Sequence, residues 1–356
     1  PRSTPKPSSA ESDVYKRQIK YQFLEKFQEV QKMSKIFPTQ EIGSLKKPTD
    51  MLKKVKDPNV SDEEKIEVRN DAALLNIKTL EDIGLDIIYD GEVRRVEMYE
   101  EPVRYVDGFE FAGRVRSWDN KYYNKARVVG PVSFRQNFHA EEFNFIKENS
   151  KREIKVPVTG AYTLADWSYD EHYKSKDELV LALARNVVRP LVKDLVRLGA
   201  KIIQIDEPAA TTHPAEMDIF RESINESVKG IDAKFVIHAC FSGNDYKALA
   251  PQMPEIKAEQ YTLEFANRDT WNEGVDDSAR KGFHVLKLFK EHGFQGEIGI
   301  GVSDVHVNEI ESPELIRDRI LYAAKALGDP TKVYVNPDCG LRTCLLYTSP
   351  SPRDRG

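Results

Sequence analysis

Cysteine is scarce in this sequence, with three residues in 356, at positions 240, 339 and 344. So few thiols cannot form a disulfide framework, and their scarcity indicates a reducing compartment, which we take to be the cytoplasm. Long apolar runs are also missing, since no stretch approaches the ~18 consecutive apolar residues of a membrane-spanning helix. No charged start followed by an apolar segment opens the chain, so a secretory signal is not expected.

Charge of one sign does not dominate either. The 53 basic and 58 acidic residues leave a net charge of -5, and they are interspersed along the chain. This balance argues against a nucleic-acid or membrane-surface partner. What is present is a hydrophobic content of 40%, enough for a large core in one big domain or two ordinary ones.

Both ends of the chain lack hydrophobic periodicity. Residues 1–18 are rich in Ser, Pro and Lys, and we expect them to be a disordered or non-native tail. Residues 344–356 interrupt what should be a further element, and we expect a non-native tail there too. This removes Cys344 from consideration and leaves residues 19–343 as a single candidate domain.

Short apolar, β-branched runs alternate with helical patterns between these ends. Ser61 is a candidate N-cap with Glu64 at the capping-box position, and Pro190 is expected to kink a helix over 176–198. The other helices are expected over 62–83, 211–228, 276–292 and 312–327. The eight strand candidates are 36–45, 85–92, 155–160, 201–208, 234–240, 258–265, 297–304 and 332–339. This alternation predicts an α/β fold, a (β/α)₈ TIM barrel, with a doubly wound open sheet as the alternative.

Two departures from a plain barrel are expected. Residues 103–134 carry aromatic-rich short segments that indicate a β-hairpin inserted after the second strand. The helix that should follow the eighth strand is replaced by the tail at 344–356, so the last helix is expected to be truncated.

Polar side chains gather where the predicted strands end, which in a barrel of this kind is the edge that carries the chemistry. His238 and Cys240 are two residues apart on one strand and should therefore share a face. Cys339 ends the eighth predicted strand and Glu264 lies near the end of the sixth. One imidazole and two thiolates suit a tetrahedral zinc site, with Glu264 as an oxygen ligand. The alternative is that each Cys is a small buried hydrophobe in a chance His-x-Cys match.

Eight motifs in this order resemble the catalytic barrel of the cobalamin-independent methionine synthase family. They are EIGSL at 41–45, YDGEVRRVEMYE at 89–100, VTGAYTLADWSY at 158–169, IIQIDEPA at 202–209, IHACFSG at 237–243, YTLEFANRD at 261–269, GIGVSDVH at 299–306 and VNPDCGLRT at 335–343. The resemblance covers residues 39–343 and is closest in kind to the short, single-barrel, archaeal-type members. It implies a zinc site made of His238, Cys240, Glu264 and Cys339.

The resemblance further implies that homocysteine is the methyl acceptor. Glu92 and Asp206 would bind its ammonium, and the backbone and hydroxyl of Ile42, Gly43 and Ser44 its carboxylate. The alternative for the two acids is a salt bridge, to Arg94, Arg95 or Lys201.

Thiol alkylation is the reaction that this family implies, of the type 5-methyltetrahydropteroyltriglutamate–homocysteine S-methyltransferase in methionine biosynthesis. Zinc would keep the substrate sulfur as a thiolate. His306, with Asp304 nearby, would handle the proton of the leaving group, and the alternative is a structural histidine. Trp167 would stack on a pterin in the donor pocket, and the alternative is core packing.

The methyl donor is left open by the resemblance. It is either 5-methyltetrahydrofolate, with or without a polyglutamate tail, or a methylcorrinoid protein that docks on the barrel mouth. Two other functions remain as alternatives: a related zinc-dependent alkyltransferase acting on another thiol such as coenzyme M, and a non-catalytic zinc-binding barrel.

Overall fold

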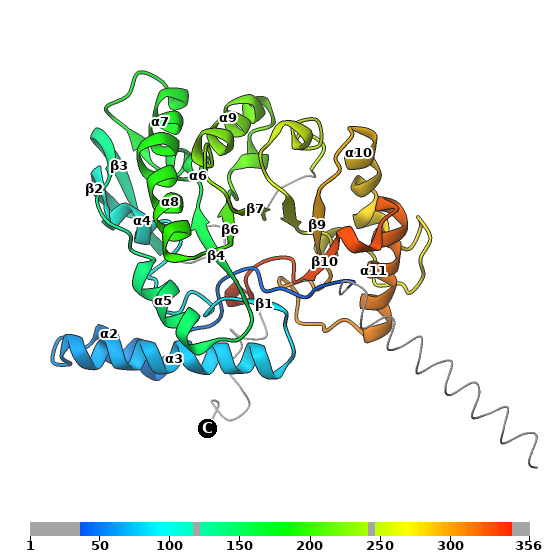
Figure 1. Ribbon diagram of the computed structural model, residues 1–356, viewed down its shortest axis with the longest axis horizontal. Coiled ribbons are helices and arrows are strands. Elements are labelled where there is room, and N and C mark those ends of the chain that lie inside the picture. The colour runs from blue at the N-terminus through cyan, green and yellow to red at the C-terminus, as the bar shows by residue number, and fades with distance from the viewer. Residues whose placement is uncertain (1–35, 117–121, 241–245, 344–356) are drawn as a thin grey trace, which may run out of the picture.

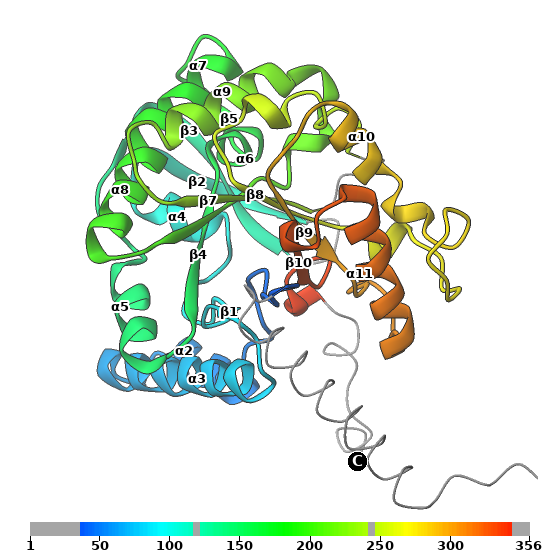
Figure 2. The same ribbon diagram turned by 45° about the vertical axis from the view of Figure 1, so that its right-hand side comes forward.

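The computed structural model describes residues 36–116, 122–240 and 246–343. The expected tails at 1–18 and 344–356, the expected truncation of the last helix, and residues 241–243 of one motif lie outside these ranges. Seven parallel strands form one sheet in the order β1-β4-β6-β7-β8-β9-β10. They are β1 (Ile87–Ile88), β4 (Glu153–Thr159), β6 (Ile202–Asp206), β7 (Lys234–Ala239), β8 (Gln260–Leu263), β9 (Glu297–Gly301) and β10 (Val333–Asn336). The sheet curls, and the helices surround it (Figures 1 and 2).

The first predicted strand lies between the two edge strands of the sheet, β1 and β10, and closes the barrel. Only Thr39 and Gln40 of the range 36–45 pair, through isolated parallel bridges to Val335 of β10 and Ile87 of β1. The backbone N–H of Gln40 donates to Val335 O at 2.9 Å, and that of Ile87 donates to Thr39 O at 3.1 Å. Pro38 has no N–H, which limits the ladder on that side. The predicted eight-position barrel is thus confirmed, with a shorter first strand than expected.

The helix expected over 62–83 is α3 (Asp62–Asp82), and its Ser61 side chain accepts from Glu64 N as predicted. The helix expected over 176–198 is divided into α7 (Lys176–Leu183), a π-helical segment (Ala184–Val188) and α8 (Arg189–Leu198). Pro190 lies in the first turn of α8. Proline offers no N–H and its ring crowds the carbonyl four residues earlier, so the wider π turn accommodates it where an α turn would not.

Two other helices are shorter than their patterns predict. The range 276–292 yields only α10 (Val285–Glu291), because the Asp276 carboxylate accepts the N–H groups of Ser278 and Ala279 in a local turn. The range 211–228 yields α9 (Met217–Ser227), preceded by two short 3₁₀ turns. The remaining helices are α2 (Thr49–Lys56), α4 (Glu100–Arg104), α5 (Ala140–Asn149), α6 (Ala161–Asp166) and α11 (Pro313–Leu327). Within the described ranges, no helix has the length and apolar character needed to cross a membrane.

The inserted hairpin is present as β2 (Val106–Arg116) and β3 (Tyr122–Phe134), which pair antiparallel. Its register shifts near Gly108 and Gly113, both at positive φ, and such bulges curve a ribbon. A short strand, β5 (Tyr169–Asp170), pairs with β3 and connects the hairpin to the segment after α6. Figure 1 shows the hairpin beside α4 and α7, on the outside of the barrel.

The alternation of side chains along the strands determines what faces the barrel interior. Ile87, Ile202 and Val236 form a small apolar cluster separate from the main core, on three different strands of the ring. Because side chains at i and i+2 share a face, the same face of β6 continues to Asp206, and that of β7 continues to His238. The carboxyl ends of the strands therefore direct polar groups into the mouth of the barrel.

Candidate metal centre

The imidazole of His238, near the end of β7, is held in place through its Nδ1 atom. Nδ1 lies 2.9 Å from the backbone oxygen of Thr262 on the neighbouring strand β8, and Nε2 lies 3.8 Å from Cys339 Sγ. The imidazole is buried. A backbone carbonyl that binds one ring nitrogen sets the tautomer and leaves the other nitrogen available as a ligand.

Three of the four predicted metal ligands come together. The ligand atoms of His238, Cys240 and Cys339 all lie within 4.8 Å of one another. Two ligands bound to one tetrahedral zinc at about 2.0–2.3 Å are themselves roughly 3.5–3.8 Å apart, which the observed imidazole–thiol separation matches. One nitrogen and two sulfurs are a donor set that suits zinc, so the residues fit this ion.

The two thiols differ in acidity. The Cys240 thiol beside it, and then His238, lower the pKa of Cys339 to about 5 against the opposing effect of burial. The hydrogen bond with Cys339, together with burial, raises the pKa of Cys240 well above its usual value. The two shifts have opposite sign, so Cys339 is the more acidic thiol of the pair.

Glu264 lies beside this group and is not one of its three members. It follows β8 and is buried. Its Oε2 accepts from Asn267 Nδ2 at 3.1 Å and lies 3.6 Å from the Arg268 guanidinium, while its Oε1 lies 3.5 Å from His306 Nε2. The fourth predicted ligand is therefore engaged with neighbouring side chains, one of which is the predicted proton handler.

A buried acid that our sequence analysis did not select holds this loop. The Asp338 carboxylate accepts the backbone N–H groups of Phe265, Ala266 and Asn267 at 2.9, 3.0 and 2.7 Å. It immediately precedes Cys339, so one side chain couples the loop after β8 to the loop after β10. Its presence in the motif at 335–343 was the available signal, but no spacing rule indicated its partners.

The two acids predicted to bind an ammonium group lie on neighbouring parts of the mouth. Asp206 is opposite His238 in the register of β6 and β7, and its carboxylate accepts from Gln204 Nε2 at 2.8 Å. Burial, the largest effect, raises the pKa of Asp206 to about 7. No ion pair with Lys201 is found for it among the described residues.

Glu92 adopts a left-handed backbone conformation, with φ of 55°, directly after Gly91. Its N–H donates to Asp90 Oδ1 at 2.8 Å, which supports the strained turn. Arg95 approaches it only to 3.9 Å and instead forms its close ion pair with Glu142 at 2.7 Å. The salt-bridge alternative for Glu92 is thus present as a long contact with Arg95, and burial raises the pKa of this carboxyl.

The predicted Ile42-Gly43-Ser44 segment borders Glu92. A Cβ on Gly43 would come within 2.3 Å of Glu92 Oε1, so a larger residue here would displace the end of the Glu92 side chain. Ile42 O accepts from Gln204 Nε2 at 2.7 Å, and Ser44 O accepts from Arg342 N at 2.8 Å. The segment is thus connected both to β6, which carries Asp206, and to the loop after Cys339.

His306 and Asp304 lie two residues apart in the loop after β9. The Asp304 carboxylate accepts the backbone N–H of His306 at 2.8 Å, whereas the imidazole faces Glu264. The Glu264 carboxylate raises the pKa of His306 despite partial burial. The partner that favours a proton on this imidazole is therefore Glu264.

Trp167 follows α6 and is half-buried. Its ring centroid lies 6.2 Å from that of Tyr99 and 6.1 Å from that of Tyr123 on the hairpin. The start of α6 is fixed by Glu207, which accepts from Thr163 N at 2.7 Å and Tyr162 N at 3.1 Å. Trp167 thus belongs to an aromatic cluster between the barrel and the hairpin.

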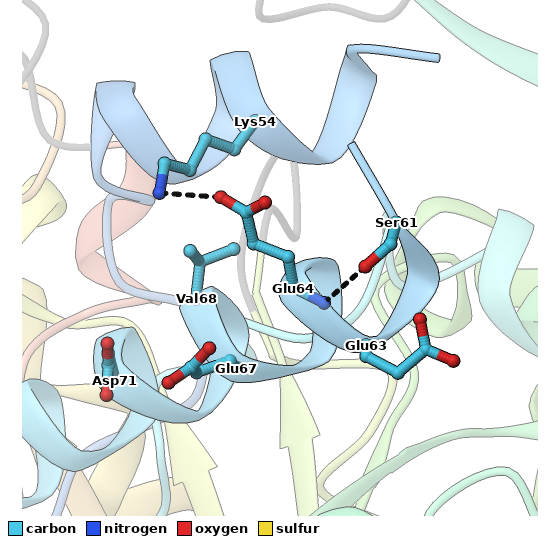
Figure 3. Close-up of a pocket in the computed structure, with 7 residues that line it drawn as sticks. All are labelled: Lys54, Ser61, Glu63, Glu64, Glu67, Val68 and Asp71. Carbon is cyan, nitrogen blue, oxygen red and sulfur yellow. Dashed lines mark hydrogen bonds and ion pairs between the residues drawn. The ribbon is translucent and has the colours of Figure 1, made fainter. Parts of the chain in front are cut away.

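A surface groove lies away from these residues, between α2 and α3 (Figure 3). Its lining includes Lys54, which binds Glu64 at 3.0 Å, and further carboxylates of α3. None of the predicted site residues lines it. The groove is therefore distinct from the candidate metal centre.

Comparison with known proteins points to one family. The family described as "Cobalamin-independent synthase, Catalytic domain" matches residues 37–348. The methionine synthases of Thermoplasma acidophilum and Thermoplasma volcanium are 43% and 42% identical over 321 and 317 residues, covering 86% of this chain and 92% and 91% of those proteins. The structure of a B12-independent methionine synthase from Shewanella sp. W3-18-1 in complex with selenomethionine is also similar. It is 25% identical, with a TM-score of 0.73, and the match covers 86% of this chain and 92% of that chain.

Proposed function

Since the chain belongs to the cobalamin-independent synthase family, we propose that it is a zinc-dependent S-methyltransferase that converts homocysteine to methionine. The observation that carries the proposal is the group of His238, Cys240 and Cys339 within 4.8 Å at the mouth of the barrel, with Asp206 opposite His238 on the next strand. A soft-donor cation site beside carboxylates suits a substrate that carries both a thiol and an ammonium group.

His238, Cys240 and Cys339 would hold the zinc, and Glu264, which lies beside them, would supply a fourth donor. When bound, zinc would favour the thiolate form of the substrate sulfur, whose free pKa is about 8.5. The solved relative in complex with selenomethionine supports an amino acid of about the size of methionine as the ligand.

Homocysteine itself would be oriented by groups around the metal centre. Asp206 and Glu92 would bind the ammonium group, and Ser44 with the neighbouring backbone N–H groups the carboxylate. Coenzyme M, which has a sulfonate and no ammonium group, would offer no positive charge to these two buried acids. The retained Glu92 and Asp206 therefore favour an amino-acid thiol.

In the transfer, the sulfur of homocysteine forms a bond to the methyl carbon as the bond from that carbon to the donor breaks. With methyltetrahydrofolate, N5 leaves as an amine and takes a proton, which His306 would supply. With a methylcorrinoid, the electron pair stays on cobalt as Co(I) and no proton is needed. The reaction balances with either donor, but only methyltetrahydrofolate needs a proton. His306 is therefore required only with that donor.

The test measures zinc by metal analysis and homocysteine methylation with each donor separately. We expect about one zinc per chain, and methionine formed with at least one donor. Zinc binding without alkylation of homocysteine by either donor would overturn the proposal and leave a non-catalytic zinc barrel. Alkylation of coenzyme M in preference to homocysteine would assign the chain to the related alkyltransferases.

The variant His306→Gln identifies the donor. Glutamine keeps a polar side chain but cannot deliver a proton, so we expect kcat with methyltetrahydrofolate to fall by roughly 10²–10⁴-fold. With methylcobalamin as donor the same variant should retain most of its activity. Equal losses with both donors would contradict the assignment of His306 as proton handler.

A further inference from the structure

Arg319 of α11 is completely buried, although it lies on the outer helical layer of the barrel. Its Nε donates to Asp269 Oδ2 at 3.1 Å, and its Nη1 donates to Val302 O at 2.7 Å and to Glu311 Oε1 at 3.1 Å. These acceptors belong to the loop after β8 and to the loop after β9. One guanidinium therefore connects the two loops that carry Glu264 and His306.

Glu311 continues this connection into the loop after β9. Its Oε2 accepts from Ser303 Oγ at 2.9 Å, and its Oε1 accepts from Asp304 N at 2.8 Å. The carboxylate is itself buried. A buried carboxylate that binds a hydroxyl, a backbone N–H and a guanidinium is fully engaged, and it fixes the start of the turn at 303–306.

The turn at 303–306 places the imidazole of His306 beside Glu264. The Asp304 carboxylate accepts His306 N at 2.8 Å, and His306 Nε2 lies 3.5 Å from Glu264 Oε1. On the other loop, Asp269 follows the short turn that carries Arg268, whose guanidinium lies 3.6 Å from Glu264 Oε2. Arg319 thus supports the Glu264–His306 contact from both sides.

We propose that Glu311 and Arg319 are positioning residues for the methyl transfer, which hold the turn at 303–306 so that His306 faces the reacting centre. This inference rests on the proposed function and on His306 as the group that meets the leaving atom. A buried ion pair is weak evidence for stability, because desolvation offsets its attraction. What such a pair fixes well is geometry, and a displacement of about 1 Å at a catalytic group can cost about 10²-fold in rate.

Arg280 offers a matched control. It is as buried as Arg319 and pairs with the same Asp269 carboxylate, at 3.0 Å. Its other contacts run to the backbone oxygens of Thr270 and Asn272, and no contact with Glu311 or the turn at 303–306 is found in the described parts of the chain. Loss of Arg280 should therefore disturb the same ion network without releasing the turn.

The experiment compares Glu311→Ala, Glu311→Gln and Arg319→Met with Arg280→Met, all in the full chain. For each variant we would measure zinc content, the melting temperature, kcat and KM for homocysteine with methyltetrahydrofolate as the donor, and amide hydrogen exchange of the peptide spanning 302–308. In Glu311→Ala and Arg319→Met we expect kcat to fall about 10- to 100-fold, with KM and zinc content within about twofold of the parent. Exchange of the Asp304 and His306 amides should accelerate. Glu311→Gln keeps an acceptor for Asp304 N, so both its kcat and its amide exchange at 302–308 should lie closer to those of the parent.

Arg280→Met should lower the melting temperature but leave the exchange of 302–308 and kcat close to those of the parent. If it lowers kcat as much as Arg319→Met does, the network is only structural and the proposal fails. Unchanged exchange in Glu311→Ala would overturn it as well. If Arg319→Met does not fold, the comparison of Glu311→Ala with Glu311→Gln still decides. The exchange readout needs no turnover, so an inactive parent would count against the proposed methyl transfer and not against this positioning role.

Discussion

At the scale of single residues, Cys339 decides whether the centre binds a metal. It lies 3.8 Å from His238 Nε2, and its thiol has the lowered pKa of the pair. Replacing it by serine substitutes a weakly acidic hydroxyl for a thiolate, which zinc binds poorly. Cys339→Ser should therefore lose zinc and homocysteine methylation together, as measured by metal analysis and activity on the same sample. Full zinc occupancy in this variant would contradict the ligand set.

Asp206 should separate substrate binding from metal binding. Asp206→Asn keeps the shape of the side chain and its contact with Gln204 but loses the charge that meets the ammonium group. A hydrogen bond to a charged partner contributes about 1.5–3 kcal/mol, so we expect KM for homocysteine to rise roughly 10- to 100-fold. Zinc content should stay at the level of the parent. Loss of zinc in Asp206→Asn would instead give this acid a role in the metal centre.

The same residue predicts a pH dependence. The pKa of Asp206 is raised to about 7, so in the free enzyme the carboxyl becomes protonated as the pH falls through neutrality. Ammonium binding requires the ionised form, and kcat/KM for homocysteine should therefore decrease below about pH 7 and level off above it. Asp206→Asn should lack this step in a profile measured over the same range. A profile that keeps the step in the variant would assign it to another group.

The residue scale also shows what the sequence could predict. The strand period of two predicted that His238 and Cys240 share a face; their ligand atoms do lie within 4.8 Å of one another, although β7 ends at Ala239. Cys339, a hundred residues away, was located only through the end of its predicted strand. The partners of Glu264 could not be inferred, because Asn267, Arg268 and His306 reach it by side-chain directions that no spacing encodes.

At the scale of elements, a long-range cap holds α6, the helix that leads to Trp167. Glu207 at the end of β6 is buried and accepts from two backbone N–H groups of α6 and from Thr163 Oγ1 at 2.6 Å. A Cβ on Gly160 would lie 2.0 Å from Glu207 Oε1, so this close approach also requires the glycine. The capping acid is supplied by another strand, and a local capping pattern would not reveal it.

Glu207→Ala should therefore destabilise the protein by roughly 2–4 kcal/mol, because it leaves several buried donors without an acceptor. The measurement is denaturant unfolding, with tryptophan fluorescence to follow the surroundings of Trp167. Ser61→Ala removes a local cap, that of α3, and should cost only about 1 kcal/mol. Equal losses in the two variants would mean that the long-range cap adds nothing beyond a local one.

Elements were predicted best where pattern and chemistry agree. Ser61 with Glu64 marks the start of α3, and the aromatic-rich short segments of 103–134 mark the hairpin. The range 276–292 was overestimated because Asp276 takes two N–H groups into a turn. The first strand was overestimated because an apolar run does not reveal how many of its residues will find a partner.

At the scale of the whole molecule, a short segment closes the barrel, since residues 38–41 share backbone hydrogen bonds with β10 on one side and with residues 86–87 on the other. Gln40 forms one of the two closing bridges, and its side chain accepts from Lys155 Nζ of β4 at 3.0 Å and donates to Asn336 of β10 at 3.2 Å. This interior network therefore joins the first strand to both sides of the ring. The same segment continues into Ser44, whereas His238 lies on β7, Cys240 directly follows β7 and Cys339 follows β10.

Gln40→Ala should in consequence loosen closure and substrate binding without removing the metal. It leaves the buried side-chain nitrogen of Lys155 without its Gln40 acceptor, and we expect a loss of about 1–3 kcal/mol in the free energy of unfolding. KM for homocysteine should rise as residues 38–46 exchange their amides faster, while zinc content stays constant. The control is Gln260→Ala, since Gln260 is equally buried but bonds Glu297 between β8 and β9, away from the closing strand. If Gln260→Ala raises KM by the same factor, barrel closure has no specific link to homocysteine binding and general loss of stability accounts for both variants.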